Sequence, residues 1–383
     1  MKAEEQLKKY FSSYKSEVKK KARGALKYDY LVPCGPYQEQ WDWDSFFIGV
    51  ALASEIPSEA IYMKNCALNY LNCVNHKTGF TPGLVTPRGR DKRLYHVKPF
   101  LVQQVYFAAK NLKDFSWVEK YFDKLEKAAT YRERYMWSKK YNLAMWYDGM
   151  ECGADNNVAV APYPKKTIIG ADLNTFLYRE YKCLSLIAYK LNKSEKRKIY
   201  QEKAHKIKRN INKYLWDKND KSYYNLNTKD GKLIKRHTYS NFIPLWEKLL
   251  PEKEGIEMIR KYMLNPKKLW SKYGVRTLAQ DDPDYNNKAI IKPCSNWQGP
   301  IWPIANYFCL HILLNYGFKK EAKILAKKIT NLCLQDIKKT GGMHENYHAE
   351  TGKPLCAPKF VSWNLLTGQM YMQARTGFNF LKI

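Results

Sequence analysis

The sequence has no apolar run long enough to cross a membrane. No window of its 383 residues approaches the roughly 20 mostly apolar residues that a spanning helix requires. The segment Met1–Arg23 is charged and amphipathic, and it lacks the apolar centre of a secretory signal peptide. We therefore expect a cytoplasmic protein that has no contact with a membrane.

Closely spaced cysteines are also missing. The sequence has nine cysteines, an odd number, and none of them stands in a Cys-x-x-Cys spacing. A zinc site and a disulfide framework are therefore not expected. We interpret all nine as free thiols, most of them buried, which again favours the cytoplasm: Cys34, Cys66, Cys73, Cys152, Cys183, Cys294, Cys309, Cys333 and Cys356.

Acidic residues are scarce, with 36 Asp and Glu against 66 Lys and Arg, so the formal net charge is +30. Such a charge raises the possibility of a nucleic-acid or anionic-surface binder. The lysines, however, are spread over nearly every predicted helix, and no nucleic-acid-binding motif is present. We favour a solvated basic surface with no specific nucleic-acid partner. The basic charge leaves one further alternative open, an enzyme that attracts an anionic substrate.

Apolar residues make up 45% of the chain and charged residues 27%, as in an ordinary globular protein. Many of the apolar residues recur at three- and four-residue spacing, which predicts helices. The predicted helical segments are Glu4–Lys21, Ile48–Ile56, Ser58–Val74, Phe100–Leu112, Trp117–Trp137, Leu173–Leu191, Glu195–Leu215, Ser240–Leu250, Glu254–Leu264, Trp302–Leu314, Lys319–Leu334 and Ser362–Ala374.

These segments are mostly paired, and the longer loops fall between alternate pairs. Strand-like alternation is limited to pieces such as Ser222–Leu226, and there is neither a heptad seam nor a low-complexity linker. Asp44 is expected to cap the helix that follows it. The pattern predicts an all-α fold, a closed toroid of helical hairpins of the (α/α)6 barrel type, with residues 1–383 in one domain. Long loops would then form the mouth of the site.

The loops between the predicted helices are rich in Trp, Tyr, Asp, Glu, Asn and Gln. The clearest is Asn296–Pro303, in which two tryptophans flank a Gly-Pro turn. A tryptophan in such a place often packs partly into the core. Sugar rings, however, offer C–H faces to aromatic rings and hydroxyls to amides and carboxylates, so several such loops indicate a carbohydrate site.

Two stretches supply candidate catalytic carboxylates. Glu151–Asn157 combines two acids with Gly and Asn, which by itself is typical of an acidic surface turn. The alternative is that Asp155 faces a sugar as a proton donor. This alternative gains weight from a second carboxylate among aromatic residues, in Gly342–Tyr347.

Six separated motifs together resemble the helical-barrel inverting glycosidases of glycoside hydrolase family 63. That family includes the mannosylglycerate hydrolase type, and the family 37 trehalases are more distant relatives. The resemblance runs from about Trp41 to Trp363. The motifs are Trp41-Asp42-Trp43-Asp44-Ser45-Phe46-Phe47, Glu151-Cys152-Gly153-Ala154-Asp155-Asn156, Asp172-Leu173-Asn174, Tyr273-Gly274-Val275-Arg276-Thr277, Trp297-Gln298-Gly299-Pro300-Ile301-Trp302-Pro303, and His344-Glu345-Asn346-Tyr347 with Thr351-Gly352.

The resemblance implies an inverting α-glycosidase in which Asp155 is the general acid and Glu345 the general base. It implies that no cofactor is needed and that the substrate is an α-glucoside or α-mannoside, either an oligosaccharide or a small glycoconjugate. His344 has packing as an equal alternative to a contact with sugar. The candidate substrate-binding residues are Trp41, Trp43, Asp44, Glu151, Trp297, Gln298, Gly299, Trp302, His344 and Tyr347.

The chemistry of inversion needs two carboxyl groups in different protonation states. One protonated carboxyl gives a proton to the leaving oxygen, and one ionised carboxylate activates water on the opposite face, about 6.5–9.5 Å away. An acid that works near neutral pH needs a raised pKa, which we expect from an apolar site or from a nearby carboxylate such as Glu151.

The chain also departs from the family pattern. Glu-Ser-Gly-Met-Asp-Asn is usual where this chain has Glu-Cys-Gly-Ala-Asp-Asn, a basic residue just beyond it is absent, and Gln298 stands where Arg is common. The sugar, linkage, aglycone and oligomeric state therefore stay open. A catalytically weak or inactive carbohydrate-binding or regulatory protein on the same barrel remains an alternative. Calcium at Asp281, Asp282 and Asp284 is a minor one, because EF-hand spacing is lacking.

Overall fold

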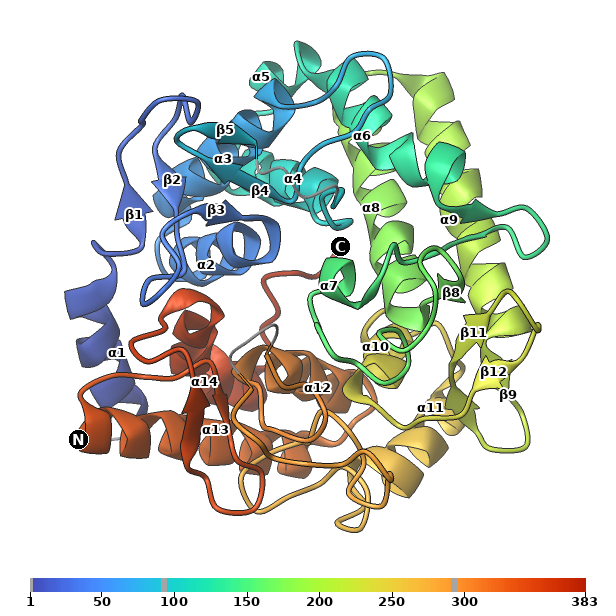
Figure 1. Cartoon of the computed structure of the whole chain (residues 1–383). Helices are drawn as coiled ribbons and strands as arrows, with labels where there is room; N and C mark the ends of the chain where they lie inside the picture. The colour runs from blue at the N-terminus through green and yellow to red at the C-terminus, as the bar shows by residue number, and fades with distance from the viewer. Residues whose placement is uncertain (1–2, 91–94, 291–294) are drawn as a thin grey trace.

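The computed structural model describes residues 3–90, 95–290 and 295–383, and its helices form two concentric rings (Figure 1). The inner ring consists of α2 (Asp42–Glu55), α4 (Leu101–Leu112), α8 (Ala171–Lys190), α10 (Ile243–Trp246), α12 (Pro303–Asn315) and η4 (Ser362–Leu366) continued by α14 (Thr367–Thr376). The outer ring consists of α1 (Ala3–Tyr14), α3 (Ala60–Asn72), α6 (Phe122–Tyr135), α9 (Ser194–Tyr214), α11 (Glu252–Met258) and α13 (Lys319–Thr340).

The two rings differ in how their apolar residues are placed. In the inner helix α12 every residue from Pro303 to Leu313 is buried, so the helix is covered on all sides. In the outer helix α9 the buried residues are Tyr200, Ala204, Ile207 and Ile211. Their spacing of three and four residues makes one apolar stripe, which faces inward while the lysine-rich face meets solvent.

The inner ring closes where the end of the chain meets its beginning. The helices η4 and α14 pack against α2, and Ser54 Oγ of α2 donates to Gln369 Oε1 of α14 at 2.8 Å. The outer helix α1 packs against α13 and α14. Outer and inner helices alternate along the sequence, which confirms the predicted (α/α)6 barrel.

Strands are short and lie in the connections between helices. The antiparallel hairpins are β1 (Lys19–Lys20) with β2 (Tyr30–Leu31), β6 (Trp137–Ser138) with β7 (Leu143–Ala144), β9 (Trp216–Asp217) with β10 (Ser222–Tyr223), and β13 (Asn346–Tyr347) with β14 (Pro354–Cys356). The three-stranded sheets are β3 (Gln40–Trp41), β4 (Leu84–Thr86), β5 (Gly89–Arg90), and β8 (Ile168–Ile169), β11 (Asn225–Asn227), β12 (Leu233–Ile234). The predicted piece Ser222–Leu226 falls on β10 and β11.

Two predictions near the amino terminus were wrong. The helix expected over Glu4–Lys21 ends at Tyr14, because Lys19 and Lys20 pair with Leu31 and Tyr30 in a hairpin. Asp44 is not a helix cap, since α2 begins at Asp42 and Asp44 is its third residue. Its carboxylate is buried and accepts a hydrogen bond from Ser362 instead.

Several other helices have different bounds from those predicted. The segment Trp117–Trp137 divides into α5 (Ser116–Glu119) and α6, and Ser58–Val74 into η1 (Pro57–Glu59) and α3. The segment Ser240–Leu250 divides into η2 (Tyr239–Phe242) and the short α10, which has Pro244 in its first turn. The segment Glu254–Leu264 becomes α11 and a π-helical turn (Ile259–Met263), and α13 continues to Thr340.

The last residues of the chain lie inside the ring (Figure 1). Leu381 is fully buried, and its carbonyl accepts a hydrogen bond of 2.7 Å from Arg179 Nη2 in α8. The ring of Phe380 packs on Phe107 of α4 at 5.7 Å. Arg179 also stacks on Trp246 of α10 at 3.9 Å, so the tail binds together three inner helices.

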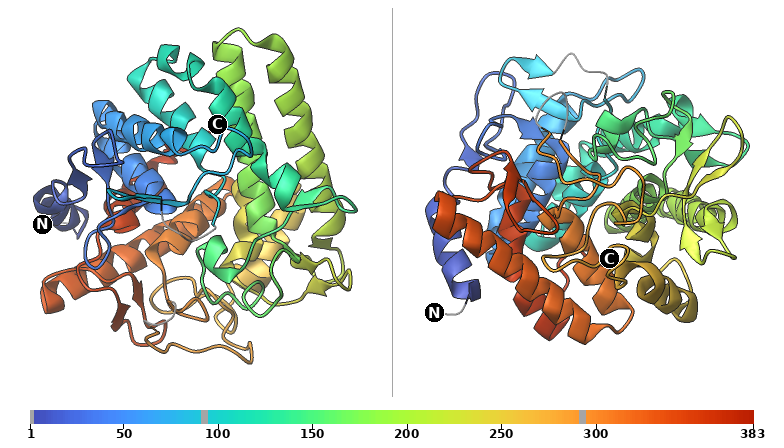
Figure 2. Two further views of the ribbon diagram at one scale, coloured as in Figure 1. Left: turned by 45° about the horizontal axis from the view of Figure 1, so that its top comes forward. Right: turned by 60° about the horizontal axis from the view of Figure 1, so that its bottom comes forward.

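The two tilted views in Figure 2 show the long outer helices along the side of the barrel. No helix in residues 3–90, 95–290 and 295–383 is both long and apolar enough to cross a bilayer. The cysteines behave as predicted wherever the structure describes them. Cys34, Cys66, Cys152, Cys183, Cys309, Cys333 and Cys356 are free and buried, Cys73 is half-buried, and Cys294 lies outside the described residues.

Candidate active site

The residues that the motifs single out meet where the inner helices begin. Asp44 lies in the first turn of α2, Asp172 in the first turn of α8, and Trp302 is the residue before α12. Helix amino termini carry a partial positive charge and free N–H groups, which favours carboxylates at this end of the barrel. This end of the barrel therefore gathers acidic side chains at the starts of its inner helices.

Glu345 reaches this end of the barrel from the loop between α13 and β13. Its backbone N–H donates to the Cys356 carbonyl at 3.0 Å, its side chain is buried, and its Oε2 has no hydrogen-bond partner in the described residues. Burial raises the pKa of Glu345 well above its usual range, and the charges of Asp44 and Asp155 raise it further. The barrel thus brings together carboxylates that lie 190 residues or more apart in the sequence.

Asp155 lies in a loop built on the short helix α7 (Gly149–Cys152). Asp148 caps that helix by accepting the Glu151 N–H, and the helix ends at Gly153 with a φ of 78°. A side chain at Gly153 would meet Lys98 at 2.9 Å, so glycine lets the loop approach this lysine closely. The Asp155 carboxylate accepts hydrogen bonds from the Ser295 hydroxyl at 2.8 Å and the Ser295 N–H at 3.3 Å.

The next residue, Asn156, joins the Asp155 loop to the loop Asn296–Pro303, called the tryptophan loop below. Asn156 Oδ1 accepts the Trp297 N–H at 2.6 Å, and the Asn156 carbonyl accepts from Gln298 Nε2 at 3.1 Å. The other end of the Gln298 amide accepts from Asn286 Nδ2 at 2.9 Å. Gln298, predicted to bind substrate, therefore uses both ends of its amide to hold two loops together.

Asp44 is the second buried carboxylate of the site. It accepts a 2.5 Å hydrogen bond from the Ser362 hydroxyl, which comes from the opposite end of the chain. Burial raises the pKa of Asp44 to about 7; the Ser362 hydrogen bond and Lys98 oppose that shift, while Asp42 adds to it. Asp42 itself pairs with Lys98 Nζ at 3.1 Å and accepts the Lys98 N–H at 2.8 Å.

Trp43 forms an apolar wall beside these acids. Phe47, Phe100 and Phe176 meet its ring edge-on at 6.0–6.3 Å, and Lys98 Nζ lies over its face at 5.5 Å. The indole is 4% exposed, and its N–H finds no partner among the described residues. A buried indole N–H usually has a partner, so this donor is open to a ligand.

A second aromatic wall comes from the tryptophan loop. Trp297 stacks on Trp302 at 3.8 Å with an interplanar angle of 15°, and on Tyr239 at 5.4 Å. Trp302 donates its indole N–H to the Asn296 carbonyl at 2.8 Å and is 1% exposed. The predicted binding residue Trp302 therefore backs Trp297, whose own N–H has no partner in the described part of the chain.

Tyr37 stands at the edge of the acid cluster. Its half-buried ring meets Trp41 edge-on at 6.2 Å, and Trp41 is itself half-buried at the end of β3. Burial raises the pKa of Tyr37, and the charges of Glu345, Asp44 and Asp155 raise it further. The phenol therefore lies near all three carboxylates, a position that the loop-like sequence around it did not reveal.

Glu151 is one of the predicted substrate-binding residues, and its stretch is largely buried, so the surface-turn alternative for that stretch was wrong. Glu151 is 1% exposed, and both carboxylate oxygens accept from Arg132, at 3.1 and 3.2 Å. Its Oε2 also accepts the Tyr147 N–H at 2.7 Å. These contacts hold the carboxylate within the protein, and its role in substrate binding stays a prediction.

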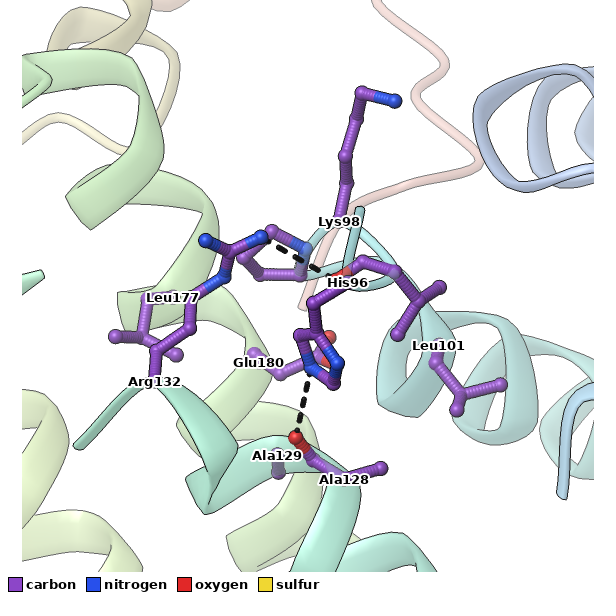
Figure 3. Close-up of a pocket in the computed structure, with 10 residues that line it drawn as sticks. His96, Lys98, Leu101, Ala128, Ala129, Arg132, Leu177 and Glu180 are labelled. Carbon is purple, nitrogen blue, oxygen red and sulfur yellow. Dashed lines mark hydrogen bonds between the residues drawn. The ribbon is translucent and has the colours of Figure 1, made fainter. Parts of the chain in front are cut away.

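Arg132 belongs to a small internal cavity beside the site, drawn in Figure 3. Arg132 Nη2 donates to the Val97 carbonyl at 3.5 Å, and the His96 ring bonds the Ala128 carbonyl at 3.2 Å. Across the cavity Glu180 accepts the N–H groups of Val102 and Gln103, at 3.0 and 3.3 Å. This network fixes the start of α4, and so the position of Lys98.

The remaining candidates serve as supports in the structure. Gly299 has a φ of 147°, and a side chain there would meet the Asn286 carbonyl at 2.4 Å, so its role is close packing of two loops. His344 and Tyr347 both donate to Asp336, at 2.9 and 3.0 Å. For His344 this contact supports the packing alternative, and a contact with sugar stays a prediction.

Sequence reasoning missed Tyr37, Lys98, Ser295, Ser362 and Asp336. Lys98 and Ser295 lie in loops whose sequence has no periodicity. Ser362 begins a predicted helix, which marked it as structural. The one signal that could have revealed them was the cluster of predicted carboxylates, because buried carboxylates need a cation and hydroxyl donors nearby.

Asp281, Asp282 and Asp284 do not form a calcium site. Asp281 pairs with Lys268, and Asp282 and Asp284 both pair with Arg236. Within the described ranges no group of three His, Cys, Asp or Glu side chains is arranged to hold a metal ion.

A family model covers most of the chain, and several known glycoside hydrolases resemble it. The family model described as "Mannosylglycerate hydrolase MGH1-like glycoside hydrolase domain" matches residues 37–363. Mannosylglycerate hydrolase of Rubrobacter radiotolerans is 26% identical over 179 residues, 47% of this chain and 38% of that protein. Mannosyl-oligosaccharide glucosidase of Saccharomyces cerevisiae is 25% identical over 199 residues, 47% of this chain and 23% of that protein.

Solved structures share the fold over nearly the whole chain. A GH63 mannosylglycerate hydrolase of Thermus thermophilus, in complex with Tris and D-glycerate, has a TM-score of 0.74 at 16% identity and covers 96% of this chain and 100% of its own. A neutral trehalase of Saccharomyces cerevisiae has a TM-score of 0.68 at 16% identity, covering 92% of this chain and 74% of its own.

Proposed function

Because the chain belongs to the mannosylglycerate hydrolase MGH1-like glycoside hydrolase family, we propose that it hydrolyses an α-linked glucoside or mannoside with inversion. Asp155 is the general acid and Glu345 the general base. The observation that carries this proposal is that Asp155 and Glu345, from distant loops, lie close enough for the charge of one to raise the pKa of the other.

The reaction needs one proton transfer on each side of the sugar. Asp155 gives its proton to the glycosidic oxygen as the bond from that oxygen to the anomeric carbon breaks. Glu345 takes a proton from a water molecule whose oxygen forms the new bond to the same carbon from the opposite face. The α-linkage is thereby converted into a β-configured free sugar.

Glu345 acts as a base in its ionised form. Its burial and its neighbours raise its pKa, and a base with a higher pKa accepts a proton more readily once it is ionised. Its Oε2 is not used by any described protein group, so it is free to accept from water.

The sugar ring would be held by groups that the protein leaves unused. The indole N–H groups of Trp43 and Trp297 are donors without partners in the described residues, and Asp44 offers an acceptor. With Asp42, Asp44, Asp155 and Glu345 against Lys98, the pocket carries an excess of acids, which favours a neutral sugar ring over an anionic one.

The aglycone is proposed from relatives. Solved structures of the Thermus thermophilus mannosylglycerate hydrolase hold glucose in one case and Tris with D-glycerate in another. A glucose or mannose joined to a small partner such as glycerate is therefore the first substrate class to test. An anionic partner would lie away from the acid cluster, where the excess of lysines in the rest of the chain favours it.

The proposal is tested with a panel of neutral and anionic α-glucosides and α-mannosides, followed by proton NMR of the released sugar. We expect the β-anomer to appear first and to identify the sugar. Asp155→Asn and Glu345→Gln should each lower turnover by at least about 10²–10⁴-fold, the usual contribution of acid–base catalysis. Glu119→Gln is the control and should keep wild-type turnover, because Glu119 lies on α5 in a partly exposed ion pair with Lys193.

Two outcomes would contradict the proposal. Unchanged turnover in either carboxylate variant would remove that residue from the mechanism. Binding of a disaccharide in calorimetry, with no product from any member of the panel, would instead support the alternative, a carbohydrate-binding protein on the same barrel. The altered residues Ala154 and Gln298 motivate that alternative, although Gln298 acts as a joint between loops.

A further inference from the structure

We propose that Asp336 is a positioning residue for the catalytic base Glu345. This inference rests on the function proposed above. Asp336 lies in the last turns of α13 and is 3% exposed. It touches neither of the two candidate catalytic carboxylates, and the sequence motifs gave no reason to select it. Most of its side-chain hydrogen bonds, however, come from His344 and Tyr347, which lie on either side of Glu345.

One oxygen of Asp336 holds the residues on both sides of Glu345. Asp336 Oδ2 accepts from the His344 N–H at 2.9 Å, from His344 Nδ1 at 2.9 Å, and from the Tyr347 hydroxyl at 3.0 Å. The other oxygen accepts from the Thr340 hydroxyl at 2.9 Å, at the end of the same helix. A single buried carboxylate thus joins the helix end to the loop by charge-assisted hydrogen bonds.

The backbone of the same loop is fixed from three further sides. The Glu345 N–H donates to Cys356 in β14 at 3.0 Å, and Asn364 Nδ2 donates to the His344 carbonyl at 2.9 Å. Tyr347 exchanges two backbone hydrogen bonds with Ile301, at 2.7 and 2.9 Å. The loop is therefore tied to β14, to η4 and to the tryptophan loop, and Asp336 supplies its anchor on α13.

This arrangement explains how Glu345 can be rigid while its carboxylate stays free. A base held by its own hydrogen bonds would have fewer lone pairs left for water, and those bonds would lower its basicity. Here the neighbours of Glu345 are held instead, and its Oε2 has no protein partner within the described ranges. A misplacement of about 1 Å at a reacting group costs about 10²-fold in rate, so loosening this anchor should be felt in turnover.

The same contacts give His344 and Tyr347 a role that differs from sugar binding. With Nδ1 of His344 facing a carboxylate oxygen at 2.9 Å, the imidazole proton on that side is shared with Asp336. The Tyr347 side chain is fully buried and its hydroxyl points to the same oxygen. Both residues therefore transmit the position of Asp336 to Glu345.

The test separates the base from the acid with an α-glycosyl fluoride of the sugar that the panel identifies. Fluoride leaves as F⁻ without being protonated, while water forms the new bond to carbon and gives a proton to Glu345. Hydrolysis of the fluoride therefore needs the base and not the acid. We expect Asp155→Asn to retain most of this activity, while Glu345→Gln and Asp336→Ala lose it.

For Asp336→Ala we expect kcat to fall about 10–10²-fold on both the fluoride and an ordinary glycoside, with KM changed by less than about twofold. Asp336→Asn keeps the shape and removes the charge, so its loss should be smaller. Thr340→Val is the milder variant, because the Thr340 hydroxyl donates to Asp336 at 2.9 Å and to the Gly342 carbonyl at 3.1 Å while the contacts of Asp336 with His344 and Tyr347 stay in place; its kcat should fall by less than that of Asp336→Ala.

A double variant distinguishes positioning from general support of the fold. If Asp336 acts through Glu345, then adding Asp336→Ala to Glu345→Gln lowers the residual fluoride hydrolysis by less than about twofold. Equal losses from Asp336→Ala in both backgrounds would overturn the inference and leave a structural role. Should Asp336→Ala fail to fold, as judged by near-ultraviolet circular dichroism, Asp336→Asn is carried through the same cycle.

The failure of this inference differs from the failure of the proposed function. Wild-type kcat in Asp336→Ala and Asp336→Asn, together with an inactive Glu345→Gln, would overturn only the positioning role. Wild-type turnover in Glu345→Gln would overturn the proposed base, and with it the premise of the inference.

Discussion

Several buried carboxyl groups hold their protons to unusually high pH. Burial raises the pKa of Asp44 to about 7, of Asp172 to about 6 and of Glu180 to about 8. Above its ordinary pKa the unfolded chain releases these protons, whereas the folded protein keeps them. Folding stability contributed by such a group falls as pH rises from its ordinary pKa to its raised one. These buried acids therefore lower the free energy of unfolding of the protein near neutral pH.

Asp44 gives a direct prediction at this scale. Asp44→Asn removes the ionisation, so the variant should gain stability relative to wild type between pH 5 and pH 8. The expected gain over that window is about 1–3 kcal/mol, from a pKa that moves between the ordinary value and about 7. The measurement is urea unfolding of both proteins at the two pH values.

Asp230→Asn, at an exposed position, is the control and should show no such difference. The same stability gain at pH 5 and pH 8 for Asp44→Asn would show that the folded Asp44 has an ordinary pKa. Because Asp44 is proposed to bind sugar, the variant should also lose activity, which is the usual exchange between stability and function.

The residues of the site were predictable to the degree that a motif marks them. Asp155 and Glu345 were selected by motifs, and the structure brings their charges together. Lys98 and Tyr37 were not selected, because nothing in a loop sequence shows which side chain turns inward. Glu151 was also selected by its motif, but its pairing with Arg132 on α6 was not predictable, because no local pattern distinguishes this arginine from the other polar residues of that helix.

At the scale of elements, the loop of Asp155 depends on one buried ion pair. Glu151 lies in α7 and Arg132 in α6, and their side chains are 1% and 2% exposed. Arg132 also lies over the Trp146 ring at 5.4 Å, just before that loop. The pair therefore fixes α7 against the outer helix and, through it, the position of the proposed acid.

Glu151→Gln should destabilise the fold by about 3–5 kcal/mol, because it leaves the Arg132 charge buried without a counter-charge. Chemical denaturation followed by circular dichroism measures the loss. Glu119→Gln breaks an ion pair whose acid is 55% exposed and should cost no more than about 1 kcal/mol. Equal costs for the two variants would show that the buried pair contributes no more than a surface one.

Element types were predictable and their ends were not. The segments that became α8, α9 and α12 have long apolar stripes or apolar residues on every side, and their bounds came out within two residues. The prediction of a helix over Glu4–Lys21 was wrong at its end. Lys19 and Lys20 continue a helical pattern but also fit a strand, and contacts elsewhere in the fold set the position of the partner strand. Short 3-10 turns such as η2 depend on side-chain caps that no periodicity reveals.

At the scale of the whole molecule, two opposing electrical environments coexist. The chain carries a net charge of +30, whereas the proposed site gathers acids around a single described lysine, Lys98. A positive molecule attracts anions over a distance set by the ionic strength, about 10 Å at 0.1 M salt. The short-range contacts inside the pocket are less affected by salt.

This contrast predicts different salt effects for the two substrate classes. For an anionic α-glycoside, kcat/KM should fall several-fold between about 0.02 and 0.5 M salt, because steering is screened. For the matched neutral glycoside it should change by less than about twofold. Steady-state kinetics with the two substrates makes the measurement, and a flat response for both would show that the basic surface does not act on the substrate.

The fold as a whole was predictable because its signal is repeated around the ring. Each predicted helical hairpin alone is a weak indication of the barrel. A chain that alternates fully buried helices with helices carrying one apolar stripe, and that has no linker, is compatible with few folds. The position of the carboxyl-terminal residues was not predictable, since Phe380 and Leu381 enter the ring through contacts with Phe107 and Arg179 that no local pattern specifies.

The hydrogen bond between Ser362 and Asp44, where the ring closes, cannot form until both residues have been synthesised. The two residues are 318 positions apart, and Glu345 precedes Ser362 by only 17 positions in the sequence. A ribosome adding about 5–20 residues per second needs roughly 15–60 s to travel from one partner to the other. During that interval the first inner helix is already synthesised but the hydroxyl partner of Asp44 is not, so the site is completed only when the last helical hairpin has been made.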